Sequence, residues 1–155
     1  MTTNSVSKPL KIYFDTCVWC RLFELSERVE MEANAVLEIL AKADRGEVEI
    51  VGSTAILAEI DLISSEEKRQ AVRGLVEKSC RIVWVREEDF RLVEEIVRLC
   101  RASAMDSLHI AVASRCADVF MTVDDALLRK KGCLKRYIEV RNPVDVYDKE
   151  RGSYD

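Results

Sequence analysis

The sequence predicts a single α/β domain built on a mainly parallel sheet. Short apolar segments alternate with longer amphipathic segments along the chain, as strands alternate with helices in such domains. The length of 155 residues suits one domain, and no repeat or linker divides it. We therefore expect residues 1–155 to form one unit, with a core over about 10–148 and short polar tails.

Five short segments have the pattern of strands. The central one, 12–14, is an apolar run too short for a helix and typical of a strand buried on both faces. Residues 47–51 alternate charged and apolar side chains, which also predicts a strand. The other predicted strands are 82–85, 119–123 and 137–140.

Apolar residues at helical spacing predict the helices between these strands. Serines that can cap a helix precede several of them, and glycines mark two of the ends. The predicted helices are 18–23, Ser26 or Glu27 to Gly46, Ser53 through Ile63, a segment opened by 64–67, 87–101, Ser103 to Cys116, and 126–131 stopped by Gly132. In 87–101 we expect Phe90, Val93, Val97 and Cys100 to face the core.

Composition and charge exclude several classes of protein. With 24 Lys and Arg against 28 Asp and Glu, the net charge of −4 excludes a strongly basic nucleic-acid binder, although not a local basic patch. No apolar stretch approaches membrane-span length and the N-terminus lacks a signal-peptide core, so we expect a cytoplasmic protein without membrane contact. The six scattered cysteines predict reduced, buried thiols rather than a disulfide framework.

Four acidic residues stand either at strand ends or at helix positions that face the core. Asp15 ends the first strand and Asp124 the fourth, and ligands of open α/β sheets bind beyond the carboxyl ends of strands. Glu59 shares a helix face with isoleucines, where a carboxylate is costly unless it is paired or binds a metal. Asp106 begins a helix that is otherwise almost wholly apolar or small.

Three of the four acids also have an ordinary structural explanation. Asp15 could cap the next helix, Glu59 could pair with an arginine at the rim, and Asp106 suits the positive end of a helix. Together, however, clustered like charges need compensation, which Mg²⁺ or Mn²⁺ supplies through its preference for oxygen ligands. Because two such ions can drive in-line displacement at phosphorus, the acids predict a metal-dependent phosphodiester hydrolase.

These residues resemble the PIN-domain family of metal-dependent ribonucleases, particularly the small VapC-like toxins. The matching segments are the strand with Asp15 and Thr16, Ser53-Thr54 followed by Glu59, the run 106–111 and the run 120–124. They stand in the family's order, and the resemblance covers roughly 10–148. Cys17 departs from the pattern, because the family often has Ser or Asn there; the change weakens a hydrogen bond to the pocket but removes no acid.

The resemblance implies a three-layer sandwich, with a mainly parallel central sheet flanked by helices and an acidic pocket at the strand ends. It also implies Mg²⁺ or Mn²⁺, cleavage of single-stranded RNA by a metal-activated water, an antitoxin protein as a candidate partner, and a homodimer. By position, the catalytic and metal-binding acids are Asp15, Glu59, Asp106 and Asp124, with Thr16 and Thr122 in support. The alternative function is a PIN-like module that binds RNA or protein with little catalysis, and the intact set of acids favours the enzyme.

Other signals point elsewhere. Cys17 and Cys20 form a CxxC after a strand, the place of a thioredoxin-like redox pair, but Pro143 is poorly placed as its cis-proline and no second CxxC completes a zinc site. A haloacid-dehalogenase-type phosphatase needs a second acid where Cys17 stands. His109 suits pocket contact or, more often, a core position.

Two further assignments depend on local geometry. The cations 129–131 and 135–136 suit either RNA phosphates or a helix terminus. Because side chains alternate along a strand, Thr122 and Asp124 are expected on one face, toward the pocket. Asp125 is then expected to cap the helix 126–131.

Overall fold

Five parallel strands form the central sheet in the part of the chain described by the structure, a computed structural model covering residues 8–24 and 26–145. The strands are β1 (Leu10–Phe14), β2 (Val48–Ser53), β3 (Arg81–Val83), β4 (Val119–Met121) and β5 (Glu139–Arg141). Their order is β3-β2-β1-β4-β5, with parallel pairing throughout. The predicted parallel sheet is confirmed, and β1 is its central strand.

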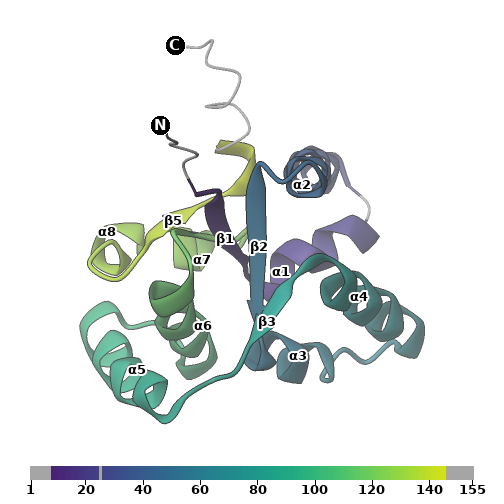
Figure 1. The fold of residues 1–155 in the computed structure, drawn as a ribbon. Coiled ribbons are helices and arrows are strands. Elements are labelled where there is room, and N and C mark those ends of the chain that lie inside the picture. Colours follow the sequence, from purple (N-terminus) through teal and green to yellow (C-terminus); the bar gives the residue numbers. More distant parts are fainter. Residues whose placement is uncertain (1–7, 25, 146–155) are drawn as a thin grey trace, which may run out of the picture.

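Helices cover both faces of the sheet, which confirms the three-layer sandwich (Figure 1). One face carries α1 (Thr16–Cys20), the 3-10 turn η1 (Arg21–Phe23), α2 (Glu27–Asp44), α3 (Thr54–Ile60) and α4 (Glu66–Ser79). The other carries α5 (Glu87–Cys100), α6 (Ala104–Cys116), α7 (Asp125–Leu128) and α8 (Lys131–Leu134). Within the described residues, none of these helices combines the length and hydropathy needed to cross a membrane.

The core lies around β1, because this strand has neighbours on both edges and helices on both faces. Ile12, Tyr13 and Phe14 are almost completely buried. The Phe14 ring packs edge-on against Trp19 with 5.1 Å between the ring centroids. The Tyr13 ring stacks on Phe120 with 5.6 Å between the ring centroids. This apolar centre holds the residue that follows β1, Asp15, in a rigid setting.

Several predicted boundaries are wrong. β2 runs on through Ser53, two residues beyond the predicted strand 47–51, and β4 ends at Met121 rather than at residue 123. Gly52 permits the close approach of β2 to β3, since a Cβ there would lie 3.2 Å from Ile82 Cδ1. The helix expected at 126–131 is two short helices, and Gly132 lies inside the second one, α8.

The predicted inward stripe of α5 is also partly wrong. Phe90 and Val97 are 54% and 39% exposed, whereas Ile96 is buried and Cys100 nearly so. Because α5 packs mainly against α6 and α8, the stripe that it buries is rotated from the one expected. Two large apolar side chains are thereby left at the surface.

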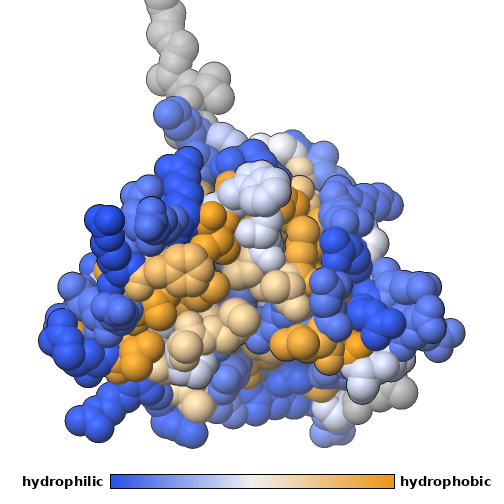
Figure 2. Space-filling model, turned by 90° about the horizontal axis from the view of Figure 1, so that it is seen from below, coloured by the Kyte–Doolittle hydropathy of each residue, from blue (hydrophilic) through white to orange (hydrophobic). Residues whose placement is uncertain are grey.

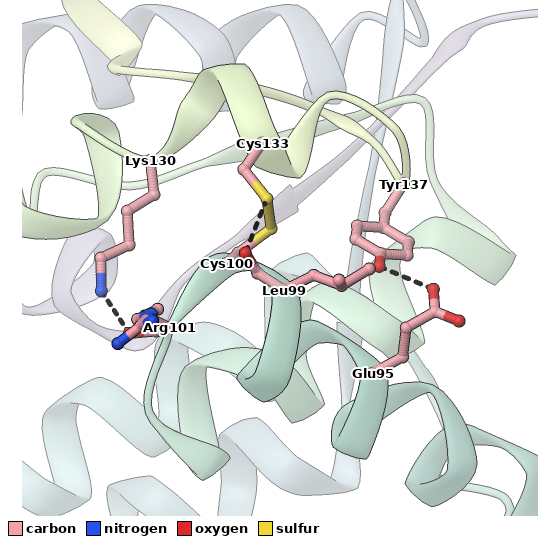
Figure 3. Close-up of a disulfide and its surroundings, with 7 residues drawn as sticks. All are labelled: Glu95, Leu99, Cys100, Arg101, Lys130, Cys133 and Tyr137. Carbon is pink, nitrogen blue, oxygen red and sulfur yellow. Dashed lines mark hydrogen bonds between the residues drawn. A yellow bond between two sulfur atoms is a disulfide. The ribbon is translucent and has the colours of Figure 1, made fainter.

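The expectation that all cysteines are reduced is wrong for one pair. Cys100, at the end of α5, and Cys133, in α8, form a disulfide across 33 residues (Figure 3). Their Cα atoms lie 5.7 Å apart because α5 and α8 pack together, a contact that no sequence spacing reveals. Among the described residues the free cysteines are Cys17, Cys20, Cys80 and Cys116.

Candidate active site

The candidate site lies at the carboxyl ends of the two central strands, β1 and β4. The chain leaves β1 toward β2 on one side and returns to pair β4 on the other, so the winding changes direction between these strands. Crevices open at such switch points in parallel α/β sheets. Asp15 follows β1 and Thr122 follows β4, which brings residues 107 apart in sequence together.

Asp15 is held in place through both of its carboxylate oxygens. Oδ1 accepts the backbone N–H of Thr16 at 2.8 Å, the capping bond of α1, and Oδ2 accepts the hydroxyl of Thr122 at 2.9 Å. The thiol of Cys17 also reaches Oδ2, at 3.4 Å. Burial raises the pKa of Asp15, and the hydrogen bond from Thr122 partly opposes that rise.

Glu59 enters the site from α3. The hydroxyl of Ser53 accepts the N–H groups of Ala55 and Ile56 and thereby starts this helix. Glu59 Oε1 accepts the hydroxyl of Thr16 at 2.6 Å and lies 2.8 Å from Nε2 of His109. The hydrogen bond to His109 lowers the pKa of Glu59 despite partial burial, so this carboxylate stays ionised.

His109 is a fully buried core residue that also contacts the site. Its Nδ1 lies 2.9 Å from the Tyr13 hydroxyl, which in turn lies 2.6 Å from Oγ of Ser53. Since an ionised carboxylate only accepts, Nε2–H donates to Glu59. Burial raises the pKa of Tyr13 well above its ordinary value, so its hydroxyl stays protonated and can donate to Nδ1. His109 is therefore both a core residue and a residue that contacts the candidate site.

Asp15, Glu59 and His109 each offer a ligand atom, and these atoms lie within 4.8 Å of one another. The two carboxylates fit a hard cation such as Mg²⁺ or Mn²⁺. His109 is better suited to orient Glu59 than to bind the ion, because both of its ring nitrogens are already hydrogen-bonded.

Asp106 lies beside this group, in the first turn of α6. The hydroxyl of Ser103 accepts the N–H of Asp106 and caps the helix, as expected. Burial raises the pKa of Asp106, and the negative charges of Asp15 and Asp124 raise it further. The carboxylates of Asp15, Asp106 and Asp124 are therefore electrostatically coupled, although only Asp15 belongs to the close group with Glu59.

The prediction that Asp125 caps the following helix is wrong, whereas the metal-binding role expected of Asp124 stays a prediction. Asp124 caps α7, with its Oδ1 accepting the N–H of Ala126 at 2.9 Å, and it is exposed. The side chains do not alternate as expected, because β4 ends before these residues and Thr122 and Val123 are both buried. Thr122 still ties the loop together, since its hydroxyl also accepts the N–H of Asp124.

Arg28 contacts the loop that follows β4, and the sequence did not predict this contact. From α2 its guanidinium makes two hydrogen bonds to Asp125, at 2.8 and 2.9 Å, and a longer one to the carbonyl of Val123. The neighbouring Glu32 is buried and holds Arg21 and Arg28 together. No local signal reveals this contact, because Arg28 and Asp125 are 97 residues apart.

Cys17 and Cys20 are free thiols, and burial raises the pKa of both, whereas redox-active thiols have lowered pKa values. Cys17 contacts Asp15 and Thr122, so it lies within the candidate site. A cleft of about 740 Å³ lies elsewhere, between Lys11, Trp84, Arg115 and Asp118. None of the predicted acids lines this cleft.

The sequence matches the family model of the PIN domain over residues 12–132. This match spans well over half of the chain, so the protein belongs to the PIN-domain family, whose members are generally nucleases. No curated protein matches the chain.

Solved structures share the fold at low sequence identity. FitAcB from Neisseria gonorrhoeae is 20% identical with a TM-score of 0.56, and the match covers 85% of this chain and 97% of that one. VapBC2 from Rickettsia felis, bound to a DNA fragment from their promoter, is 15% identical with a TM-score of 0.61, covering 86% and 98%. These likenesses agree with the family assignment and describe the fold alone.

Proposed function

We propose that this protein is a metal-dependent endoribonuclease that cleaves single-stranded RNA, with Asp15, Glu59, Asp106 and Asp124 as its metal-binding acids. The observation that carries the proposal is the placement of Asp15 and Glu59. They lie in one group of possible ligands and are each oriented by a threonine, Thr122 for Asp15 and Thr16 for Glu59.

The residues have distinct roles in this proposal. Asp15 and Glu59 would bind the ion within the close group, and Asp106 and the exposed Asp124 would bind it from the sides of α6 and α7. The repulsion that raises the pKa of Asp106 favours occupancy of the site by a cation. A bound Mg²⁺ or Mn²⁺ would lower the pKa of a water ligand and stabilise the charge that develops on a phosphodiester.

A cleavage assay tests the function. Purified protein should cut an unstructured RNA with Mn²⁺ or Mg²⁺ and stop in EDTA. Glu59→Gln should reduce cleavage roughly 100-fold or more, because the charge is lost while the shape is kept. The exposed Glu38 on α2 supplies the matched control, Glu38→Gln, which should cleave as the wild type does. Cleavage that persists in EDTA would contradict the proposal.

We also propose an antitoxin protein and a second copy of this chain as partners. Structures of FitAB and VapBC2 share this fold.

Figure 2 views the molecule from below, onto the carboxyl edge of the sheet, and shows apolar side chains gathered in a broad patch. Trp84 and Phe90 follow the carboxyl end of β3 and are 78% and 54% exposed. Such patches are typical of protein interfaces. Light scattering checks the dimer, whose mass would be twice 17.7 kDa.

A further inference from the structure

One surface of this acidic protein is strongly cationic. Residues 126–138 contain five cations and no acid, and residues 96–105 contain two cations and no acid, in a chain of net charge −4. We call the seven side chains the cationic surface: Arg98, Arg101, Arg129, Lys130, Lys131, Lys135 and Arg136. Within the fold the two segments that carry these side chains meet, because the end of α5 packs against α8.

The cationic surface differs from the rest of the molecule in how its charges are balanced. Most arginines elsewhere among the described residues lie against carboxylates, as in the pairs Arg73–Asp61, Arg81–Glu49 and Arg115–Asp89. In the part of the chain that the structure describes, no member of the cationic surface makes an ion pair. Lys130 instead donates to the backbone carbonyl of Arg101, and all members except Lys130 are exposed.

Covalent and polar contacts hold these like charges together (Figure 3). The Cys100–Cys133 disulfide joins the two halves, and Tyr137 donates a hydrogen bond to Glu95 at 2.7 Å beside it. Unscreened cations gathered in this way repel one another and lower stability. An anionic ligand with several charges would remove that repulsion.

The cationic surface is continuous with the proposed site. Arg101 lies just before Ser103, whose side chain caps the helix that carries Asp106. Lys130 follows α7, the helix that Asp124 caps. The cations therefore begin on the side of the site where Asp106 and Asp124 stand.

The geometry points to the cationic surface as the binding site for the phosphate backbone of single-stranded RNA, leading from the acids across the ends of α5 and α8. This inference rests on the proposed function and adds to it the path of the substrate. A cluster of acids repels a polyanion, so a neighbouring row of unpaired cations supplies the attraction. Contact with phosphates, not bases, makes this binding independent of sequence.

RNA binding in EDTA tests the inference separately from cleavage. The variant Lys131→Gln/Lys135→Gln should weaken binding of a fluorescent, unstructured RNA roughly 10-fold near 0.1 M salt. The slope of log affinity against log salt should fall by about 1.4, because each phosphate contact to a single strand contributes about 0.7. The control variant Lys8→Gln/Lys78→Gln makes the same charge change at two exposed lysines outside this surface and should bind as the wild type does.

The outcomes separate the two proposals. If the wild type binds RNA through this surface but never cleaves it, the surface stands and the ribonuclease fails. If cleavage occurs and Lys131→Gln/Lys135→Gln keeps the wild-type KM, affinity and salt slope, the surface is refuted and the ribonuclease stands. A raised KM with unchanged kcat is expected, because neither lysine reaches the reacting phosphate. Binding of polyglutamate in place of RNA would assign the surface to an acidic protein and overturn the inference.

Discussion

Nε2 of the completely buried His109 lies 2.8 Å from Oε1 of Glu59, and this contact orients a site carboxylate from within the core. The other ring nitrogen is bonded to Tyr13, and Tyr13 to Ser53, the residue that starts the helix of Glu59. The hydrogen bonds therefore run from Ser53 through Tyr13 and His109 to Glu59. They tie the position of Glu59 to the sheet.

Replacing the histidine should loosen the metal site. His109→Phe keeps a ring in the core but removes both hydrogen bonds, so Mn²⁺ affinity should fall about 10–100-fold. The pKa of Glu59 should rise, because the bond to His109 is the main cause of its lowering. Titration calorimetry with Mn²⁺ measures the first effect, with Tyr13→Phe as the milder variant that keeps the contact to Glu59. Unchanged affinity in His109→Phe would show that Glu59 needs no orientation.

Variants of Asp124 should separate its charge from its capping role. Asp124→Asn keeps a good helix cap and removes the charge, so it should lose the Mn²⁺-induced rise in Tm and keep the metal-free Tm. Asp124→Ala should also lose about 1 kcal/mol of capping, a fall in Tm of about 2–4 °C. Asp125→Ala loses the contact to Arg28 and should keep the Mn²⁺ response. The opposite pattern would move the site to Asp125.

Metal binding should weaken as the pH falls. Burial raises the pKa of both Asp15 and Asp106 above the ordinary 3.8, and a protonated carboxyl does not hold the ion. Loss of Mn²⁺ affinity should therefore begin above the range in which exposed aspartates titrate. Affinities measured from about pH 8 down to about pH 4 check this prediction. A midpoint near 3.8 would contradict the raised pKa values.

The raised pKa of Asp106 also affects the stability of the metal-free protein. Because folding raises the pKa of Asp106, its ionised form is disfavoured in the native state above the folded pKa, and this penalty disappears below the unfolded value. Asp106→Asn should therefore raise the Tm in EDTA at about pH 8 and lose that advantage at about pH 3. A gain that is independent of pH would point to a packing effect instead.

Reduction should destabilise the protein. A disulfide closing a loop of this length contributes about 3–4 kcal/mol, so a reductant should lower the Tm by about 10 °C. Cys133→Ser should be insensitive to the same reductant. Thiol counting in denaturant should find Cys17, Cys20, Cys80 and Cys116 reactive before reduction. Reaction of Cys100 and Cys133 as well would restore the expectation of reduced thiols, which suits a cytoplasmic protein.

Local signals in the sequence were enough for the elements that depend on neighbours in the chain. The apolar run before Asp15 marked the central strand, and Ser53 and Ser103 marked two helix starts, because caps and strand patterns act over a few residues. The inward position of Glu59 also followed from its spacing to isoleucines. The order of the acids indicated the family that the sequence match then showed.

Only the tertiary structure decided which distant residues meet. The bond from His109 to Glu59 joins positions 50 apart and that from Arg28 to Asp125 joins positions 97 apart. The disulfide and the surface it stabilises likewise depend on the packing of α5 against α8. The capping role of Asp124 was missed because β4 ends two residues early, and that end depends on where the neighbouring strands stop pairing. Pairing, packing and charge across the sheet are long-range, so no periodicity within one segment encodes them.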